Sequence, residues 1–131
     1  MRVESELQVA RSIQEYLFPR VTPVLRGVTI SGRTLPARTV GGDLYDFFDL
    51  GRGRVGILCA DVSGKGIPAA LMMANLQAVA RAHIGDRVVR PGAPPADFVE
   101  VLNQDLTGRF GDNRYATLIL FGRSTTPTRR Y

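Results

Sequence analysis

The sequence predicts an α+β fold, because helical and strand-like hydrophobic patterns follow one another along a chain of 131 residues. Apolar residues recur at helical spacing in residues 3–18 and again in 67–83, where Pro68 lies in the first turn. Two further apolar runs, 44–50 and 55–61, are joined by the glycine-rich link "GRGR", which is typical of a β-hairpin. At this length the elements are expected to share one domain.

The N-terminal helix has two interpretations. Charged residues lie between its apolar positions, and Pro19 and Pro23 prevent its continuation. A helix of about four turns is too short to form a stable coiled coil by itself. It therefore either packs on its own domain or forms the end of a linker helix from an upstream domain. We assign residues 1–19 to this linker-type helix.

The remaining segments complete the predicted domain. Alternating apolar residues predict a strand within 27–37, a shorter helical pattern follows at 96–110, and an apolar run predicts another strand at 114–122. The last residues, 123–131, are expected to be a disordered tail. The globular part is therefore predicted to span residues 20–122.

Composition excludes several classes of function. The net charge is +5, but the basic residues are scattered arginines with one lysine and form no basic stripe, so we expect no binding to nucleic acid. No apolar run is long enough to span a membrane. The N-terminus "MRVESELQ" is charged where a secretory signal would be apolar, which predicts a cytoplasmic protein. The single cysteine, Cys59, lies inside an apolar run and is expected to be a buried core thiol.

Two aspartates stand at the ends of apolar strands. The first is Asp43 in "VGGDLYDFFDL" (40–50), and the second is Asp61 in "ADVSGKG" (60–66). If the end of the first strand pairs with the start of the second across the link, the two backbones meet at the open end of the hairpin, within about 5–6 Å. In that register the two side chains start on opposite faces of the sheet. A one-residue bulge, or a bend at the strand ends, lets them converge.

Two neighbouring carboxylates repel each other unless a cation neutralises them. Mg²⁺ and Mn²⁺ prefer carboxylate and carbonyl oxygens, and the adjacent glycines allow the backbone to approach an ion closely. The alternative is that Asp43 and Asp61 are turn residues whose side chains cap local backbone amides. The spacing and residue types alone leave both interpretations open.

The two aspartate motifs also carry a resemblance to a known family. "VGGDLYDFFDL" followed by "ADVSGKGIPAALMMA" is similar to the paired signature of the metal-dependent protein phosphatase (PPM) family, in its bacterial branch of stage II sporulation protein E and sigma-B-regulator phosphatases. "ARSIQEYLFP" resembles the linker helix that precedes that domain. The resemblance implies an α-β-β-α sandwich that hydrolyses phosphoserine or phosphothreonine with metal-activated water, and no catalytic side chain is assigned.

The resemblance further implies the residues of a two-metal site for Mg²⁺ or Mn²⁺. Asp43, Asp61 and the backbone carbonyl of Val62 match ligands of the family. The residues expected to surround these ligands are Gly42, Asp46, Ser63 and Gly64. Asp46 also alternates with aromatic residues, and its other interpretation is a solvated strand or turn residue.

Family members continue well beyond the last predicted strand and carry two later aspartates of the metal site there. The resemblance therefore implies that this chain holds the N-terminal part of the domain, with a sandwich that is incomplete at the C-terminus. The implied partners are a phosphorylated anti-sigma-factor antagonist as substrate and a second copy bound through the N-terminal helix. The alternative function is a catalytically incompetent interaction module of the same fold.

Overall fold

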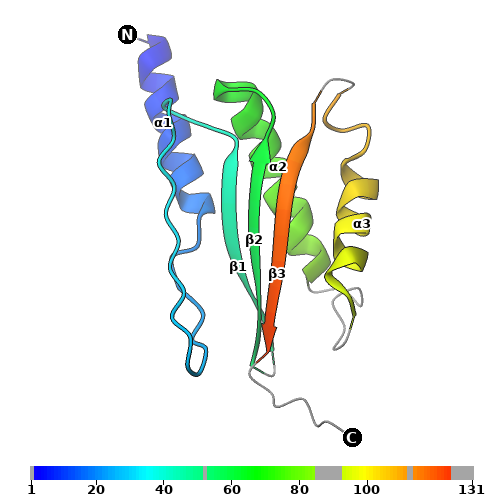
Figure 1. Cartoon of the computed structure of the whole chain (residues 1–131). Coiled ribbons are helices and arrows are strands. Elements are labelled where there is room, and N and C mark those ends of the chain that lie inside the picture. The colour runs from blue at the N-terminus through cyan, green and yellow to red at the C-terminus, as the bar shows by residue number, and fades with distance from the viewer. Residues whose placement is uncertain (1, 52, 85–92, 112–113, 125–131) are drawn as a thin grey trace, which may run out of the picture.

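The computed structural model describes residues 2–51, 53–84, 93–111 and 114–124. Its helices and strands are, in chain order, α1 (Arg2–Leu17), β1 (Asp43–Gly51), β2 (Arg54–Val62), α2 (Gly66–Ile84), α3 (Pro95–Leu106) and β3 (Ala116–Ser124). Within these residues the strands form one antiparallel sheet with the order β1-β2-β3 (Figure 1). The predicted α+β class is confirmed.

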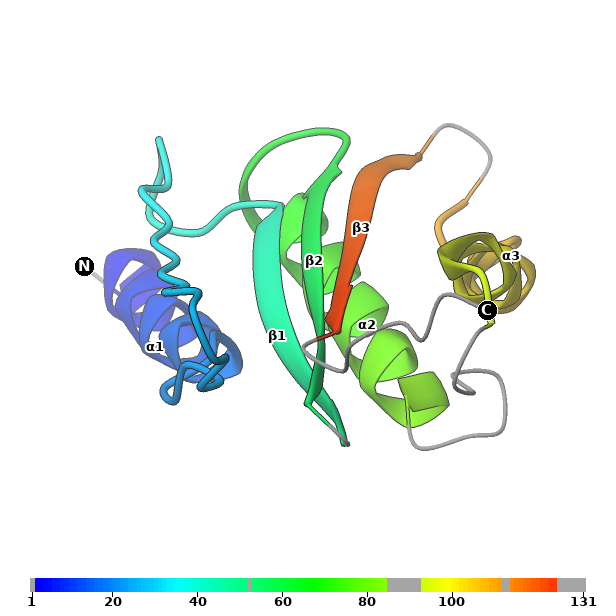
Figure 2. The same cartoon turned by 60° about the horizontal axis from the view of Figure 1, so that its bottom comes forward.

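Helices α2 and α3 cover one face of this sheet, and α1 lies beside its β1 edge (Figure 2). Strand alternation sends every second side chain of the sheet to the covered face. The buried core there consists of Leu44, Phe48, Leu58, Ala60, Val62, Met73, Leu76, Val79, Ala80, Phe98, Leu102 and Phe110. This single cluster joins the hairpin to both helices, so the open end of the hairpin is held in place relative to α2.

The segment between α1 and β1 is not the strand predicted within residues 27–37. Apart from an isolated bridge between Leu25 and Val28, the described residues of this segment form no strand pairing. The apolar alternation is too short to form a ladder before Gly32 interrupts it. The segment is attached by side chains instead, because Leu25 is buried and the Tyr45 hydroxyl donates a hydrogen bond to the Gly32 carbonyl at 3.0 Å.

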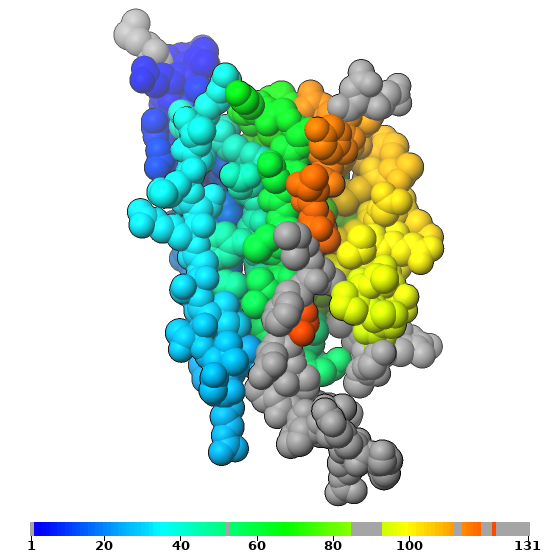
Figure 3. Space-filling model, in the orientation of Figure 1, coloured from blue at the N-terminus to red at the C-terminus, as the bar shows by residue number. Residues whose placement is uncertain are grey.

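The other face of the sheet is partly open. Alternation along β2 places Ile57, Cys59 and Asp61 on the face away from α2, and both Cys59 and Asp61 are exposed. Figure 3 views this face and shows the central strand at the surface between the segment 18–42 and β3. Cys59 is therefore not the buried core thiol that the sequence predicted. An apolar run in a strand has two faces, and only one of them is covered here.

Helix α1 is the least buried helix of the described chain. None of its residues is buried, although Leu17 and the following Phe18 pack partly against the core. The helix thus packs on its own domain through one half-buried side, which runs from Leu7 to Leu17. No helix in the described part of the chain is both long and apolar enough to cross a bilayer.

The ends of the other elements differ little from the predicted ones. Helix α2 matches the predicted range 67–83 closely. Helix α3 ends earlier than predicted, at Leu106, because the chain turns at Gly108, whose φ is 83°. Strand β3 continues to Ser124, two residues into the range predicted as a tail, and the remaining residues of that range, 125–131, lie outside the described part.

Candidate metal centre

The hairpin register brings Asp43 and Asp61 together. The two residues pair directly, and the register continues to Asp49 before it shifts ahead of Gly51. The shift leaves Leu50 as an extra residue in β1, which is a β-bulge next to the turn. The predicted hairpin is therefore confirmed, with its bulge at the turn end and its two aspartates at the open end.

This register differs by one residue from the predicted one. The predicted pairing of the end of the first strand with the start of the second put the two carboxylates on opposite faces of the sheet. In the structure the bulge, one of the two ways expected for convergence, places both carboxylates on the same face. The Cβ atoms of directly opposed residues are about 4.5–5.5 Å apart, so the two carboxylates are close neighbours.

Both aspartates line a pocket of about 370 Å³ at the open end of the hairpin. Its walls come from α1, from the segment before β1 and from the loop after β2. Its lining also includes Gln14, Arg38, Gly42, Gly64, Lys65 and Gly66. The carboxylates therefore face a concave space of the size that binds small ligands.

The pKa of Asp43 is raised above its ordinary value of 3.8. Partial loss of hydration is the largest cause, followed by the negative charge of Asp61 and a hydrogen bond between the two carboxyl groups. Among the described residues no third His, Cys, Asp or Glu completes a cluster that could hold a metal ion. The aspartate pair is thus a site that favours binding a proton.

Two of the predicted glycines shape the site through the backbone. Gly42 has no room for a side chain, since a Cβ there would lie 2.8 Å from the Val62 carbonyl oxygen and 3.1 Å from the Cβ of Ala69. This close approach lets the Val62 N–H donate a hydrogen bond to the Gly42 carbonyl at 3.1 Å. Gly64 lines the pocket with a φ of 92°, a conformation that residues with side chains rarely adopt.

Val62 and Ser63 lie at the end of β2 in different roles. The Val62 side chain is 1% exposed, and its carbonyl oxygen lies beside Gly42. Ser63 fastens the loop to the start of β3, because its N–H donates to the Tyr115 carbonyl at 2.8 Å and its Oγ accepts from the Tyr115 N–H at 2.9 Å. The structure therefore brings Gly42 and Gly64 to the aspartate pair, whereas Ser63 is engaged in holding the loop.

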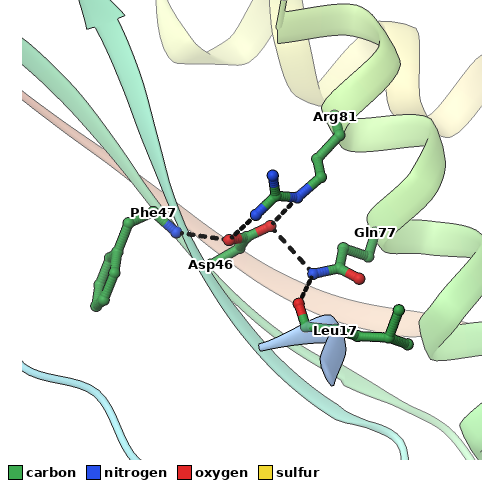
Figure 4. A network of polar contacts seen from close by, with 5 residues as sticks. All are labelled: Leu17, Asp46, Phe47, Gln77 and Arg81. Atoms are coloured by element: carbon green, nitrogen blue, oxygen red, sulfur yellow. Dashed lines mark hydrogen bonds and ion pairs between the residues drawn. The ribbon is translucent and has the colours of Figure 1, made fainter. Parts of the chain in front are cut away.

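Asp46 is fully buried, which rules out its interpretation as a solvated strand or turn residue. Arg81 donates to it from Nε and Nη2 at 2.8 Å each, Gln77 Nε2 donates at 3.2 Å, and a backbone N–H donates at 2.9 Å (Figure 4). Strand alternation turns this carboxylate toward α2, whereas Asp43 and Asp61 lie on the opposite face. The structure therefore does not bring Asp46 to the aspartate pair.

Comparison with known proteins identifies the family to which these motifs belong. The family model of stage II sporulation protein E (SpoIIE) matches residues 51–130, which is more than half of the chain. The chain belongs to the SpoIIE family. The matched range includes Asp61 and the loop that follows β2.

Two relatives extend the comparison toward the N-terminus. The chain is 30% identical over 102 residues to phosphoserine phosphatase RsbU of Bacillus subtilis (strain 168), in an alignment that covers 78% of this chain and 29% of that protein. It is 29% identical over 126 residues to protein IcfG of Synechocystis sp., covering 96% of this chain and 19% of that protein. The chain thus spans less than a third of the length of these relatives. The second alignment is long enough to include both aspartate motifs.

Sequence reasoning missed the polar residues that hold these SpoIIE-family motifs in place. Gln77 and Arg81 lie one turn apart on the sheet-facing side of α2 and both bind Asp46. Gln14 of α1 pairs with the backbone of Gly41, beside the aspartate pair. Polar residues at i and i+4 within the apolar surface of a helix indicate a buried polar partner. The contact of Gln77 and Arg81 with Asp46 could therefore have been expected from the sequence. Nothing in the sequence links Gln14 to Gly41.

Proposed function

We propose that this chain forms the N-terminal part of a Mg²⁺- or Mn²⁺-dependent protein serine/threonine phosphatase domain. The observation that carries the proposal is the direct pairing of Asp43 with Asp61 in a pocket, within a chain of the SpoIIE family. Two ionised carboxylates in this position repel each other and lower the stability of the free protein. A divalent cation between them removes that repulsion.

The oxygen donors of the site suit a hard divalent cation. The proposed ligands are the carboxylates of Asp43 and Asp61, with the backbone carbonyl of Val62 as a further one. Mg²⁺ binds through one or two carboxylates and keeps several waters, so a small set of protein donors is adequate for it. The raised pKa of Asp43 supports this assignment, because a cation can replace the proton that the pair favours. Bound divalent cations would supply Lewis-acid activation of water and neutralise charge on a phosphoryl group.

The chain's own cations are placed to attract the phosphate of a substrate. Arg38 and Lys65 line the pocket, and Nη1 of Arg38 lies 4.0 Å from the position that a Cβ on Gly66 would occupy. Arg11 also lines the pocket but is engaged in an ion pair with Glu15, at 3.1 Å. A phosphorylated side chain in the pocket would meet these positive charges on the wall beside the aspartate pair. This arrangement supports a phosphorylated substrate.

The partly open sheet face supports the sandwich architecture. Tyr45, Phe47 and Ile57 are only half-buried on the face away from α2, and Cys59 is exposed there. The two sheets of a sandwich pack about 10 Å apart and bury such side chains between them. We therefore propose that a second sheet covers this face in an α-β-β-α arrangement, with residues 20–122 as the first part of that domain.

The proposed substrate is a phosphoserine or phosphothreonine protein of the anti-sigma-factor-antagonist type. The relative from Bacillus subtilis is named a phosphoserine phosphatase, and the aspartate motifs resemble those of sigma-regulator phosphatases. A homodimer through α1 is also part of the proposal, because Val9, Ile13 and Tyr16 form an exposed apolar stripe along that helix. A cytoplasmic location stays a prediction.

The alternative function is a catalytically incompetent interaction module of the same fold. It is favoured by the small number of ligands, since the described residues form no cluster of three metal-binding side chains, and Glu15, which also lines the pocket, is paired with Arg11. Such a site would hold a cation weakly. In this alternative the pocket and the open sheet face would bind a partner without hydrolysis.

Hydrolysis of p-nitrophenyl phosphate separates the two functions. We expect a Mn²⁺-dependent rate from the wild-type chain, and we expect Asp61→Asn to lower it by about 100-fold. The matched control is Asp49→Asn on the same hairpin, because Oδ1 of Asp49 accepts from the Gly51 N–H at 2.8 Å and asparagine can keep that bond. If the wild-type rate at millimolar Mn²⁺ does not exceed the Asp61→Asn rate, the enzymatic proposal for this chain is wrong.

A further inference from the structure

The side chain of Gln14 forms a two-bond pair with the backbone of Gly41. Nε2 of Gln14 donates to the Gly41 carbonyl at 2.7 Å, and Oε1 accepts from the Gly41 N–H at 3.1 Å. The two residues are 27 positions apart in the chain, so this contact is tertiary. The N–H and the oxygen of the Gln14 amide thus both hydrogen-bond to the backbone of Gly41, which fixes the orientation of that backbone.

The next residue of this turn is held from the opposite side. The Gly42 carbonyl accepts from the Val62 N–H at 3.1 Å, and the space around Gly42 is filled by Val62 and Ala69. Two consecutive residues before Asp43 are therefore anchored by two different elements, α1 and β2. Asp43 is the first residue of β1 and follows these two anchored residues directly in the chain.

Gln14 is the polar residue on the half-buried side of α1, where its neighbours Leu7, Ala10 and Leu17 are apolar. No residue of α1 is buried, and its apolar contact with the core is made by the partly buried Leu17. The Leu17 carbonyl also accepts a hydrogen bond from Gln77 Nε2. Gln14 itself is half-buried and lines the same pocket as Asp43 and Asp61. Gln14 therefore joins the position of α1 directly to the position of the Asp43 turn.

We propose that Gln14 is a positioning residue of the metal site: it holds the Gly41–Asp43 turn in the conformation that sets the Asp43 carboxylate beside Asp61. The inference rests on the proposed function, because it takes Mn²⁺ or Mg²⁺ to be the ion that binds to Asp43 and Asp61. Because the coupling between two sites is reciprocal, metal binding at Asp43 and Asp61 also stabilises the docking of α1.

The test compares Gln14→Met with Gln8→Met in the full chain. Gln8 is exposed on the same helix, and its backbone carbonyl accepts from the Ser12 hydroxyl at 3.1 Å, while its side chain forms no hydrogen bond within the described residues. The control therefore makes the same chemical change away from the turn. Titration with Mn²⁺, followed by the electron paramagnetic resonance signal of the free ion, gives the dissociation constant. We expect Gln14→Met to weaken Mn²⁺ binding by about five-fold or more. Gln8→Met should stay within about two-fold of the wild type.

A second readout does not depend on the metal. Amide hydrogen exchange of residues 41–43 in metal-free protein should be faster in Gln14→Met and unchanged in Gln8→Met, because only the first variant loses the bonds to Gly41. A merely structural role for Gln14 in attaching α1 would speed exchange in the helix and leave the turn and the Mn²⁺ affinity as in the wild type. Should Gln14→Met fail to fold, Gln14→Asn, which is too short to reach both groups, replaces it with the same expectations.

The outcomes separate this inference from the proposed function. If wild-type protein binds Mn²⁺ more tightly than Asp61→Asn but Gln14→Met binds like the wild type, the inference is overturned and the function stands. If wild type and Asp61→Asn bind Mn²⁺ equally weakly, the function fails, and unchanged exchange at residues 41–43 would also refute Gln14 as the residue that holds the turn. Faster exchange with weaker binding in Gln14→Met alone supports the inference.

Discussion

Two aspartates on β1, Asp43 and Asp46, have opposite environments, although they are only three residues apart in the sequence. Asp46 is 0% exposed and accepts hydrogen bonds from Arg81 and Gln77 of α2. Asp43 is exposed to the pocket, and its cross-strand neighbour is a second carboxylate, that of Asp61. The fold therefore neutralises one aspartate and leaves the other beside a like charge.

This difference separates a structural carboxylate from a binding one. The negative charge of Asp46 is balanced by Arg81 within the chain. The ion pair of Asp46 therefore affects the stability of the free protein. The negative charge of the aspartate pair is balanced when a cation or a proton binds to it. The pair therefore stabilises the bound state of the protein and not the free state. Substitutions at the two places should accordingly change stability in opposite directions in metal-free protein.

The largest effect is expected for Asp46→Asn. Breaking a buried ion pair costs about 3–5 kcal/mol, and the loss here should be about 3 kcal/mol because the Arg81 side chain is 53% exposed and can turn to solvent. Urea denaturation of metal-free protein measures it, with Asp49→Asn as the exposed control on the same strand. A loss no larger than that of the control would place Asp46 among the solvated residues after all.

A smaller effect is expected for the stabilisation by metal. Mn²⁺ at ten times its dissociation constant should raise the free energy of unfolding of the wild-type chain by about 1.4 kcal/mol. Asp61→Asn should abolish this gain, because it removes one carboxylate of the proposed ligand set. Thermal unfolding with Mn²⁺ and with EDTA measures the difference. An equal rise of the midpoint in both proteins would show that the ion binds elsewhere.

The smallest effect is expected for Asp43→Asn without metal. Since the pKa of Asp43 is raised above 3.8, the folded protein binds this proton more tightly than the unfolded chain, and stability falls as the pH rises through the raised pKa. At neutral pH the substitution should therefore increase the free energy of unfolding, by about 0.5 kcal/mol for a partly exposed like-charge pair. Urea denaturation in EDTA from acidic to neutral pH tests this. A wild-type slope with pH that Asp43→Asn does not flatten would contradict it.

Sequence alone determined the elements that depend on neighbouring residues. The helical spacing of α2 and the glycine-rich link of the hairpin act over a few positions, and both elements were predicted close to their observed ends. The pairing argument also predicted that Asp43 and Asp61 meet at the open end of the hairpin. Its error of one residue arose at Leu50, where a bulge that the residue types do not specify shifts the register.

Only the tertiary structure decided which carboxylates are neutralised and what holds the turn before Asp43. The bond from Arg81 to Asp46 spans 35 residues, and the pair between Gln14 and Gly41 spans 27. Both contacts exist because α2 lies across the sheet and α1 lies along its edge, and the packing of whole elements is not encoded in a local pattern. The sequence therefore predicted where two carboxylates would meet, whereas the arrangement of the helices determined that Asp46 belongs to the core and that the aspartate pair remains open to the pocket.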